Sequence, residues 1–438
     1  MVNRFDKWFN RNIDGLIRRL KEASSARVQW IVALTLLFTG LVGVYLTGPW
    51  LSTNSLSLGR HTTALFIPIF LSMAFYTYST LIGQQTKRNK LLSFAIYFLL
   101  TLPLVNHLNM EVSHLDGDDS SETSDVAHYM IENKTLYGVY LGKEFLSVPL
   151  SEFRSENELP VFKLQYGLRY VLAGSILVFG GENRWIHVFW LFVYLTLSIF
   201  VLDAISARGS PALSFWGATV ALLSIPYACK MILMTMNEPY AVMAMALFLI
   251  FFSQKRLYLA AVGLALVPFF RQNMAIFSFL AFVFVLRSKD IRIWMTYGIV
   301  FLFPIWHNLF YAGKIAFFTN GSINGVAQSK FLSVGDLRGF DAFLHNTLHY
   351  FGACSLLSNL GSYVIAWLFI PLSTALLIRS FFFTNKIDFV KYVLLAGSAI
   401  GPAIIFGSDT YPRFEYVNLL CIFMAYSAYH FKFKMKHQ

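Results

Sequence analysis

The amino-acid sequence predicts an all-α polytopic membrane protein with about twelve transmembrane helices, two long outer loops and interfacial helices. Hydrophobic residues make up 56% of the 438 residues and charged residues only 13%, whereas soluble globular chains have about 45–50% apolar and about 25% charged residues. Phe alone occurs 44 times, which is more apolar surface than one soluble core of this length can bury. This composition excludes a soluble globular protein, and it also excludes disordered, collagen-like and coiled-coil chains.

Residues 1–27 predict a cytoplasmic amphipathic helix that lies in the membrane interface. Apolar side chains such as Trp8 and Leu16 recur at helical spacing, and basic residues such as Arg11 and Arg18 lie between them. A cleavable signal peptide is not expected, because the apolar run that follows is long enough to span the bilayer and carries no small-residue cleavage site.

Apolar segments of membrane-spanning character follow along the whole chain. The first two form an N-terminal transmembrane hairpin, 28–84. Several later segments are shorter than the roughly 20 residues that a crossing needs, so the two that flank Arg271 are alternatively one broken hairpin. The twelve segments are 28–48, 63–84, 91–108, 184–204, 212–228, 239–253, 257–270, 274–286, 293–306, 358–378, 392–407 and 414–431.

Basic residues are divided unequally between the two sides of these spans. The N-terminal segment, alternate short loops and the basic tail 432–438 hold 22 of the 35 Lys and Arg residues. The positive-inside rule makes that side cytoplasmic and places both termini there. The net charge of +12 therefore reflects topology and contact with anionic lipid, and nucleic acid is not expected as a partner.

The first long outer loop, about 109–183, opens with five carboxylates within ten residues, from Asp116 to Asp125. One interpretation is a solvated acidic loop. A calcium loop fails, because Ser121 and Ala127 stand where Gly and a bidentate Glu are needed. A catalytic interpretation is favoured by position, since carboxylates close to the bilayer surface can meet the phosphate of a lipid-borne substrate. Segment 160–183 is expected to be a helix that lies in the outer interface.

The second long outer loop, about 307–357, begins with His307 and Asn308 and continues with Gly313 and Lys314. An aromatic belt at the membrane surface explains the neighbouring Trp and Tyr residues. It does not explain these hydrogen-bonding and basic residues, which we interpret as candidates for a substrate pocket.

Three further charged residues lie at predicted span ends on the same outer side. Arg271 stands between apolar runs, where an unpaired charge costs about 2.5–3.5 kcal/mol on insertion scales. The alternative for Arg271 is a snorkelling or loop-tip arginine. Glu238 opens the sixth span, and Arg413 follows Tyr411 before the last one.

Taken together, these motifs resemble the GT-C superfamily of integral-membrane glycosyltransferases, which use polyprenyl-phosphate sugars as donors. The resemblance covers about 91–431, and we assign 85–431 as a GT-C-like transmembrane domain. One departure is that the acidic motif follows the third span, where the family usually has it after the first. The motifs that carry the resemblance are Asp118-Asp119 to Tyr129, Glu238, Arg271, 307–314 and 411–414.

The resemblance implies an inverting transfer with a role for each motif. Asp119, Asp125 or Asp118 would act as the catalytic base, and Arg271 and Arg413 would bind the donor phosphate. The family pattern does not say which acid is the base. The substrate pocket would be formed by Glu238, His307, Asn308, Lys314 and Tyr411. No metal site is indicated, because the three cysteines have no ligand spacing. No cofactor is assigned, and a divalent cation is left open.

The function expected from the sequence is transfer of a sugar from a polyprenyl-phosphate donor to a glycan or lipid-linked acceptor. It would take place at the outer face of a bacterial inner membrane, in surface polysaccharide, O-antigen or lipopolysaccharide modification. The expected partners are therefore the donor, the acceptor and the lipid bilayer. Two alternatives remain: a transporter or flippase for a lipid-linked saccharide, and a polysaccharide polymerase or ligase.

Overall fold

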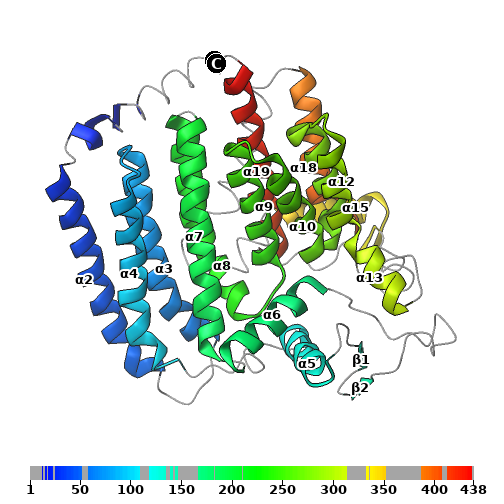
Figure 1. The fold of residues 1–438 in the computed structure, drawn as a ribbon, viewed down its shortest axis with the longest axis horizontal. Helices are drawn as coiled ribbons and strands as arrows, with labels where there is room; N and C mark the ends of the chain where they lie inside the picture. Colours follow the sequence, from blue (N-terminus) through cyan, green and yellow to red (C-terminus); the bar gives the residue numbers. More distant parts are fainter. Residues whose placement is uncertain are drawn as a thin grey trace. The chain divides into compact units, whose positions relative to one another are not determined.

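Helices make up nearly all of the regular structure in the described part of the chain (Figure 1). The computed structural model also holds two short antiparallel hairpins within that part, β1 (Val139–Leu141) with β2 (Glu144–Leu146) and β3 (Ser333–Val334) with β4 (Leu337–Arg338). The residues described are Asn12, Gly15, Leu16, 18–22, 25–51, 58–108, 118–134, 139–141, 144–146, 166–181, 183–209, 211–312, 332–334, 336–351, 386–406 and 412–436.

Two compact units divide the chain. The first unit contains residues Met1–Glu111, Arg184–Leu233 and Ser427–Gln438. Its main helices are α2 (Ala26–Leu51), α3 (Leu58–Leu81), α4 (Lys87–Val105), α7 (Arg184–Arg208) and α8 (Pro211–Leu233).

The helices of the first unit lie side by side around α3, which packs against α2, α4, α7 and α8 (Figure 1). In the most apolar stretch of α3, 61% of the residues are buried, against 22% in α2. The outward face of α2 carries large apolar side chains such as Phe38 and Tyr45, which are exposed. An apolar exposed face is expected of a helix that contacts lipid.

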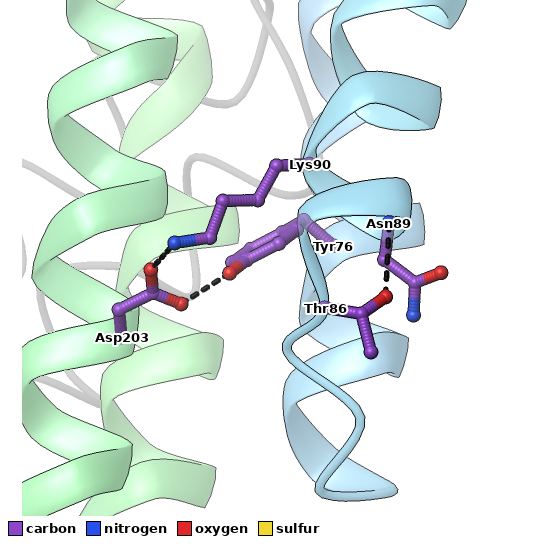
Figure 2. Close-up of polar contacts among 5 residues, drawn as sticks. All are labelled: Tyr76, Thr86, Asn89, Lys90 and Asp203. Carbon is purple, nitrogen blue, oxygen red and sulfur yellow. Dashed lines mark hydrogen bonds and ion pairs between the residues drawn. The ribbon is translucent and has the colours of Figure 1, made fainter.

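Polar contacts join three helices of the first unit at one end (Figure 2). The Lys90 ammonium and the Tyr76 hydroxyl both donate to the carboxylate of Asp203, and so connect α4, α3 and α7. Nearby, the side chain of Thr86 caps α4 by accepting a hydrogen bond from the backbone N–H of Asn89 at 3.3 Å. Because Lys90 and Asp203 are only about one-fifth exposed, pairing compensates both charges.

The second unit contains residues Val112–Asn183 and Met234–Tyr426. Its helices are α5 (Asp118–Glu132), α6 (Tyr166–Phe179), α9 (Glu238–Ser253), α10 (Leu257–Phe270), α11 (Ala275–Ala281), α12 (Ile291–Phe301), α13 (Phe303–Ala312), α15 (Phe340–Phe351) and α18 (Lys386–Phe406). A 3₁₀ turn, Gln272–Met274, precedes α11, and a π-helical turn, Phe282–Leu286, follows it. Helix α19 (Pro412–Lys436) contributes residues to both units.

Within the second unit, α10 is the most connected helix, because it packs against α9, α12, α11 and α6. Figure 1 shows α6 running obliquely to α9 and α10. Two short connections in this unit pass through left-handed backbone at basic residues: Lys255 has φ 61° between α9 and α10, and Arg287 has φ 48° before α12.

The class predicted from the sequence is confirmed, since the chain is an all-α membrane protein. In the described part of the chain, five helices, α2, α3, α4, α7 and α8, are long and apolar enough to cross a membrane. Helices also occupy eleven of the twelve apolar segments; the remaining one, 358–378, lies outside the described residues. The number of twelve spans stays a prediction.

Helices are also found in segments that the sequence assigns to the interface and the outer loops. A helix is present within 160–183, as expected: α6, Tyr166–Phe179. Its position in the outer interface stays a prediction. Of the amphipathic helix expected over 1–27, residues 12, 15, 16 and 18–22 are described and helical, and 26–27 already belong to α2. The other residues of that segment, apart from Ser25, lie outside the described residues.

Candidate functional site

The helical hairpin of α9 and α10 brings the start of one helix and the end of the other together. The two helices are joined by the short turn Gln254–Arg256 and pack closely along their length. A Cβ atom at Gly263 would lie 2.7 Å from the backbone N of Phe248, so only glycine permits this approach of the two backbones. Residues before α9 and after α10 therefore lie at the same end of the hairpin.

Helix α10 stops at Arg271 in the middle of an apolar stretch. Arg271 has φ −137° and ψ 87°, outside the helical region, and the 3₁₀ turn begins at the next residue. Pro268 lies in the last turn of α10, where it withholds one N–H donor and weakens helical continuation. The two apolar runs that flank Arg271 are thus separated by a backbone break, and the guanidinium stands at that break.

Arg271 and Glu238 form an ion pair at this end of the hairpin. Nη1 of Arg271 lies 3.2 Å from Oε1 of Glu238, and the side chains are 13% and 2% exposed. Glu238 is the first residue of α9, where a negative charge is favourable because helix N-termini carry positive partial charge. Each of these two sequence-predicted residues neutralises the other in surroundings that exclude most water.

Aromatic rings surround the same end of the hairpin. The ring of Phe270 lies 5.8 Å from that of Tyr240, centroid to centroid, and Phe269 stacks on Tyr170 of α6 at 6.3 Å. Gly167, near the start of α6, fits against the backbone carbonyl of Phe269, where a Cβ would lie only 2.6 Å from the oxygen. Helix α6 therefore covers the end of α10.

Helix α6 also carries a buried cation, Arg169. Arg169 is only 7% exposed and lies between Gly167 and Tyr170, the two residues that contact Phe269. The sequence analysis gave Arg169 no role. The available signal was a charged side chain in an otherwise apolar segment.

The predicted acidic motif lies on a helix that packs against α6. Helix α5 begins at Asp118 and carries Asp119 and Asp125, and α5 contacts α6 within the second unit. The buried residues of α5 include Val126, Ala127 and Met130. The acidic helix α5, helix α6 and the α9–α10 hairpin thus form a continuous chain of contacts, from α5 to α6 to α10.

The other sequence-predicted residues are placed by their backbones alone or fall outside the described part. His307 and Asn308 belong to α13, and Arg413 is the second residue of α19. The side chains of these residues, and of Asp118, Asp119 and Asp125, lie outside the described atoms, as do Lys314 and Tyr411 entirely. Among the described residues, no three His, Cys, Asp or Glu side chains cluster as metal ligands.

Sequence reasoning also missed polar residues of the first unit. Asp203 and Lys90 were assigned to a span end and a cytoplasmic loop without a role, although they pair across α7 and α4. His187 is buried in α7, and its Nδ1 lies 3.2 Å from the backbone O of Ile232. The signal available in the sequence was a charged or imidazole side chain in or beside an apolar run, which indicates a paired or functional residue.

Comparison with known protein families, curated proteins and solved structures finds no match to this chain. The candidate site therefore stands on the geometry of the second unit: a paired carboxylate and guanidinium at a helix break, a covering aromatic helix with a buried arginine, and an adjoining acidic helix.

Proposed function

We propose that the protein is a GT-C-type integral-membrane glycosyltransferase that moves a sugar from a polyprenyl-phosphate donor to a glycan or lipid-linked acceptor. The observation that carries this proposal is the Glu238–Arg271 ion pair at the break after α10. Buried charge at a break in an apolar helix is costly, and it is typical of substrate sites in membrane proteins.

The guanidinium of Arg271 is suited to the phosphate of the donor. A phosphate carries the same sign of charge as the Glu238 carboxylate and fits the guanidinium fork through two parallel hydrogen bonds. Glu238 would hold the guanidinium in place before substrate binds, and phosphate would then share or replace that contact. Arg169, on the covering helix, offers a second cation for the same anion.

The reaction requires a base and a stabilised leaving group. In the proposed transfer, the acceptor hydroxyl oxygen bonds to the anomeric carbon while the bond from that carbon to the phosphate oxygen breaks. The hydroxyl proton passes to a carboxylate of α5, and polyprenyl phosphate leaves with the bonding electron pair. Asp119 and Asp125 are our first candidates for the base, followed by Asp118, and Arg271 and Arg413 would offset the charge on the leaving phosphate.

The site also suits a substrate that stays in the membrane. Tyr170, Phe269, Phe270 and Tyr240 line the end of the hairpin, and aromatic side chains are favoured at headgroup depth. A phosphate attached to a lipid would reach Arg271 there while its chain remained among the acyl chains. His307, Asn308, Lys314 and Tyr411 stay our candidates for contacts with the sugar.

Binding of undecaprenyl phosphate tests the role of Arg271. With the purified protein in nanodiscs, we expect Arg271→Gln to weaken binding at least tenfold and Arg271→Lys to recover part of it. Arg256→Gln is the matched control, since it removes the same charge from the other, exposed end of the hairpin. Equal affinity in Arg271→Gln and Arg256→Gln would contradict the proposal.

Measurement of sugar transfer in cells distinguishes a transferase from a flippase and from a polymerase or ligase. Cells that lack the gene should lose one sugar from a surface glycan, and Asp119→Asn or Asp125→Asn should fail to restore it while still binding undecaprenyl phosphate. If all carboxylate variants of α5 restore the sugar, a flippase for a lipid-linked saccharide fits better, because broken helices with buried charge also occur in transporters. Loss of a whole polymer, with single repeat units retained, would instead indicate a polymerase or ligase.

A further inference from the structure

Helix α15 has three different sides. At about 100° per residue, Ala342 and Asn346 project within about 40° of each other, and Phe340, Phe343 and Leu344 fall within an arc of about 100°. The first pair is buried, whereas Phe340, Phe343 and Leu344 are 74%, 39% and 46% exposed. Asp341 and His345 form the third side and are also exposed.

The buried side of α15 attaches it to the end of α18. The Asn346 side-chain Nδ2 donates to the backbone carbonyl of Ile404 at 2.9 Å, and Ile404 is two residues from the end of α18. The backbone N–H of Leu332, just before β3, donates to the carbonyl of Ile405 at 2.8 Å. Both the helix and the preceding hairpin are thus held at the level where α18 ends.

Helix α18 is a predicted span, and its own side chains fit a lipid-facing position. Val393 and Leu394 are exposed at levels of 44% and 47%. These values resemble those of the apolar side of α15. A helix fixed at the end of such a span lies at the depth of the lipid headgroups.

We propose that α15 lies in the membrane surface with Phe340, Phe343 and Leu344 inserted among the lipids and with Asp341 and His345 toward water. The occupant of the exposed apolar side is therefore bilayer lipid. A helix that contacts only water needs two sides, one buried and one polar. The third, apolar side of α15 requires a third environment, and the attachment to α18 supplies it.

Leu337, in the strand β4 that contacts α15, is a further exposed apolar residue. It is 40% exposed, and Arg338 follows it. Basic residues beside an inserted apolar group are favourable near anionic headgroups. The hairpin and the helix together would form one lipid-contacting element.

Spin labelling along α15 tests this inference. Single cysteines would be introduced at positions 340 to 347 in the full chain, with Cys229, Cys354 and Cys421 replaced by Ala, and the labelled protein reconstituted in liposomes. Collisions with oxygen, which partitions into lipid, would be compared with collisions with a water-soluble nickel chelate. We expect oxygen to dominate at 340, 343 and 344, the nickel chelate to dominate at 341 and 345, and neither to reach 342.

Two results would overturn the inference. If the nickel chelate reaches 343 and 344 as readily as 341, the apolar side faces water. If neither reagent reaches 340, 343 or 344, another protein segment or a second copy covers it. Should Phe340→Cys fail to fold, Leu344→Cys reports the same side one turn later. None of these outcomes depends on sugar transfer, so the inference and the proposed function can fail separately.

Discussion

Glu238 and Arg271 form a largely buried ion pair in the second unit. Both side chains are largely removed from water, and their charged atoms lie 3.2 Å apart. Removal of one partner from a buried pair leaves the other charge uncompensated, which typically costs about 3–5 kcal/mol. Replacement of both residues by apolar ones lowers the free energy of unfolding much less. Comparison of single and double variants can therefore separate an effect on stability from an effect on function.

A double-mutant cycle tests whether this pair acts as a unit. We expect Glu238→Gln and Arg271→Met each to lower the apparent melting temperature strongly, and the double variant to be less destabilised than the sum of the two. Thermal unfolding in one detergent measures this. Glu22→Gln is the matched control, because its pair with Arg18 is exposed and such pairs contribute about 0–1 kcal/mol. Additive effects at Glu238 and Arg271 would argue against coupling.

Asp290 is a charged residue that caps the start of α12. Its carboxylate accepts hydrogen bonds from the backbone N–H of Arg292 and from the hydroxyl of Tyr258, each at 2.9 Å. These contacts, with the Arg292 N–H first, hold the pKa of Asp290 below its ordinary value. Ionised Asp290 therefore stabilises the folded state.

The pH dependence of this stabilisation follows from the direction of the pKa shift of Asp290. A lowered pKa in the folded state gives stability that is complete above the unfolded pKa of about 3.9 and lost as the pH falls through the folded value. We expect the melting-temperature difference between wild type and Asp290→Asn to be constant from about pH 8 to pH 5 and to vanish in stronger acid. The control is Asp336→Asn, an exposed carboxylate between β3 and β4. A difference that grows on acidification would contradict the assigned sign.

At the scale of single elements, the α9–α10 hairpin sets the geometry of the candidate site. The close approach at Gly263 fixes the separation of the two helices, and that separation determines where Glu238 and Arg271 meet. A side chain at Gly263 has to push against backbone, which cannot move without moving α9.

Gly263→Ala tests this dependence. We expect a loss of about 1–3 kcal/mol from overpacking and weaker binding of undecaprenyl phosphate, because the ion pair is displaced. Gly298→Ala in α12 is the matched control, since no atom lies within 4 Å of the added Cβ, and Ala in a helix interior is favoured over Gly by about 0.5–1 kcal/mol. Equal effects of the two changes would show that the hairpin tolerates wider spacing.

Element positions were largely predictable because apolar runs determine where helices form in a membrane chain. Helix α9 begins at Glu238 and α6 lies within 160–183, both as the sequence indicates. At Arg271 the sequence allows two alternatives, because a charge in an apolar run is compatible with either a turn or a snorkelling side chain.

The pairings within the site could not be predicted. Glu238 and Arg271 are 33 positions apart in sequence, and their contact depends on the antiparallel register of α9 and α10, which Gly263 sets by packing. Helix α6, which carries the buried Arg169, meets the same helix end through Gly167. Such contacts between helices leave no periodic signal in one sequence. The predicted roles of Asp119, Asp125 and Arg413 stay predictions.

At the scale of the whole molecule, the main testable property is which side of the membrane each loop faces. The distribution of Lys and Arg predicts both termini in the cytoplasm. We expect single cysteines within 113–123 and 320–336, and at 341 and 345, to react with a membrane-impermeant reagent added outside intact cells. Cysteines at 87, 88 and 380–388 should react only after the membrane is opened. Protection of both long loops would contradict the orientation and with it the outer-face site.

The left-handed residues Lys255 and Arg287 have a consequence for how the chain is made. Glycine is the usual residue at such helix ends, and a side chain there costs about 1–2 kcal/mol in the folded protein. Both residues belong to loops whose basic residues predict the cytoplasmic side. We therefore expect each to lower folded-state stability while its charge helps to retain the loop on that side during insertion. We expect the variant with glycine at both positions to have a higher melting temperature once folded. We also expect part of its population to insert into the membrane with inverted topology.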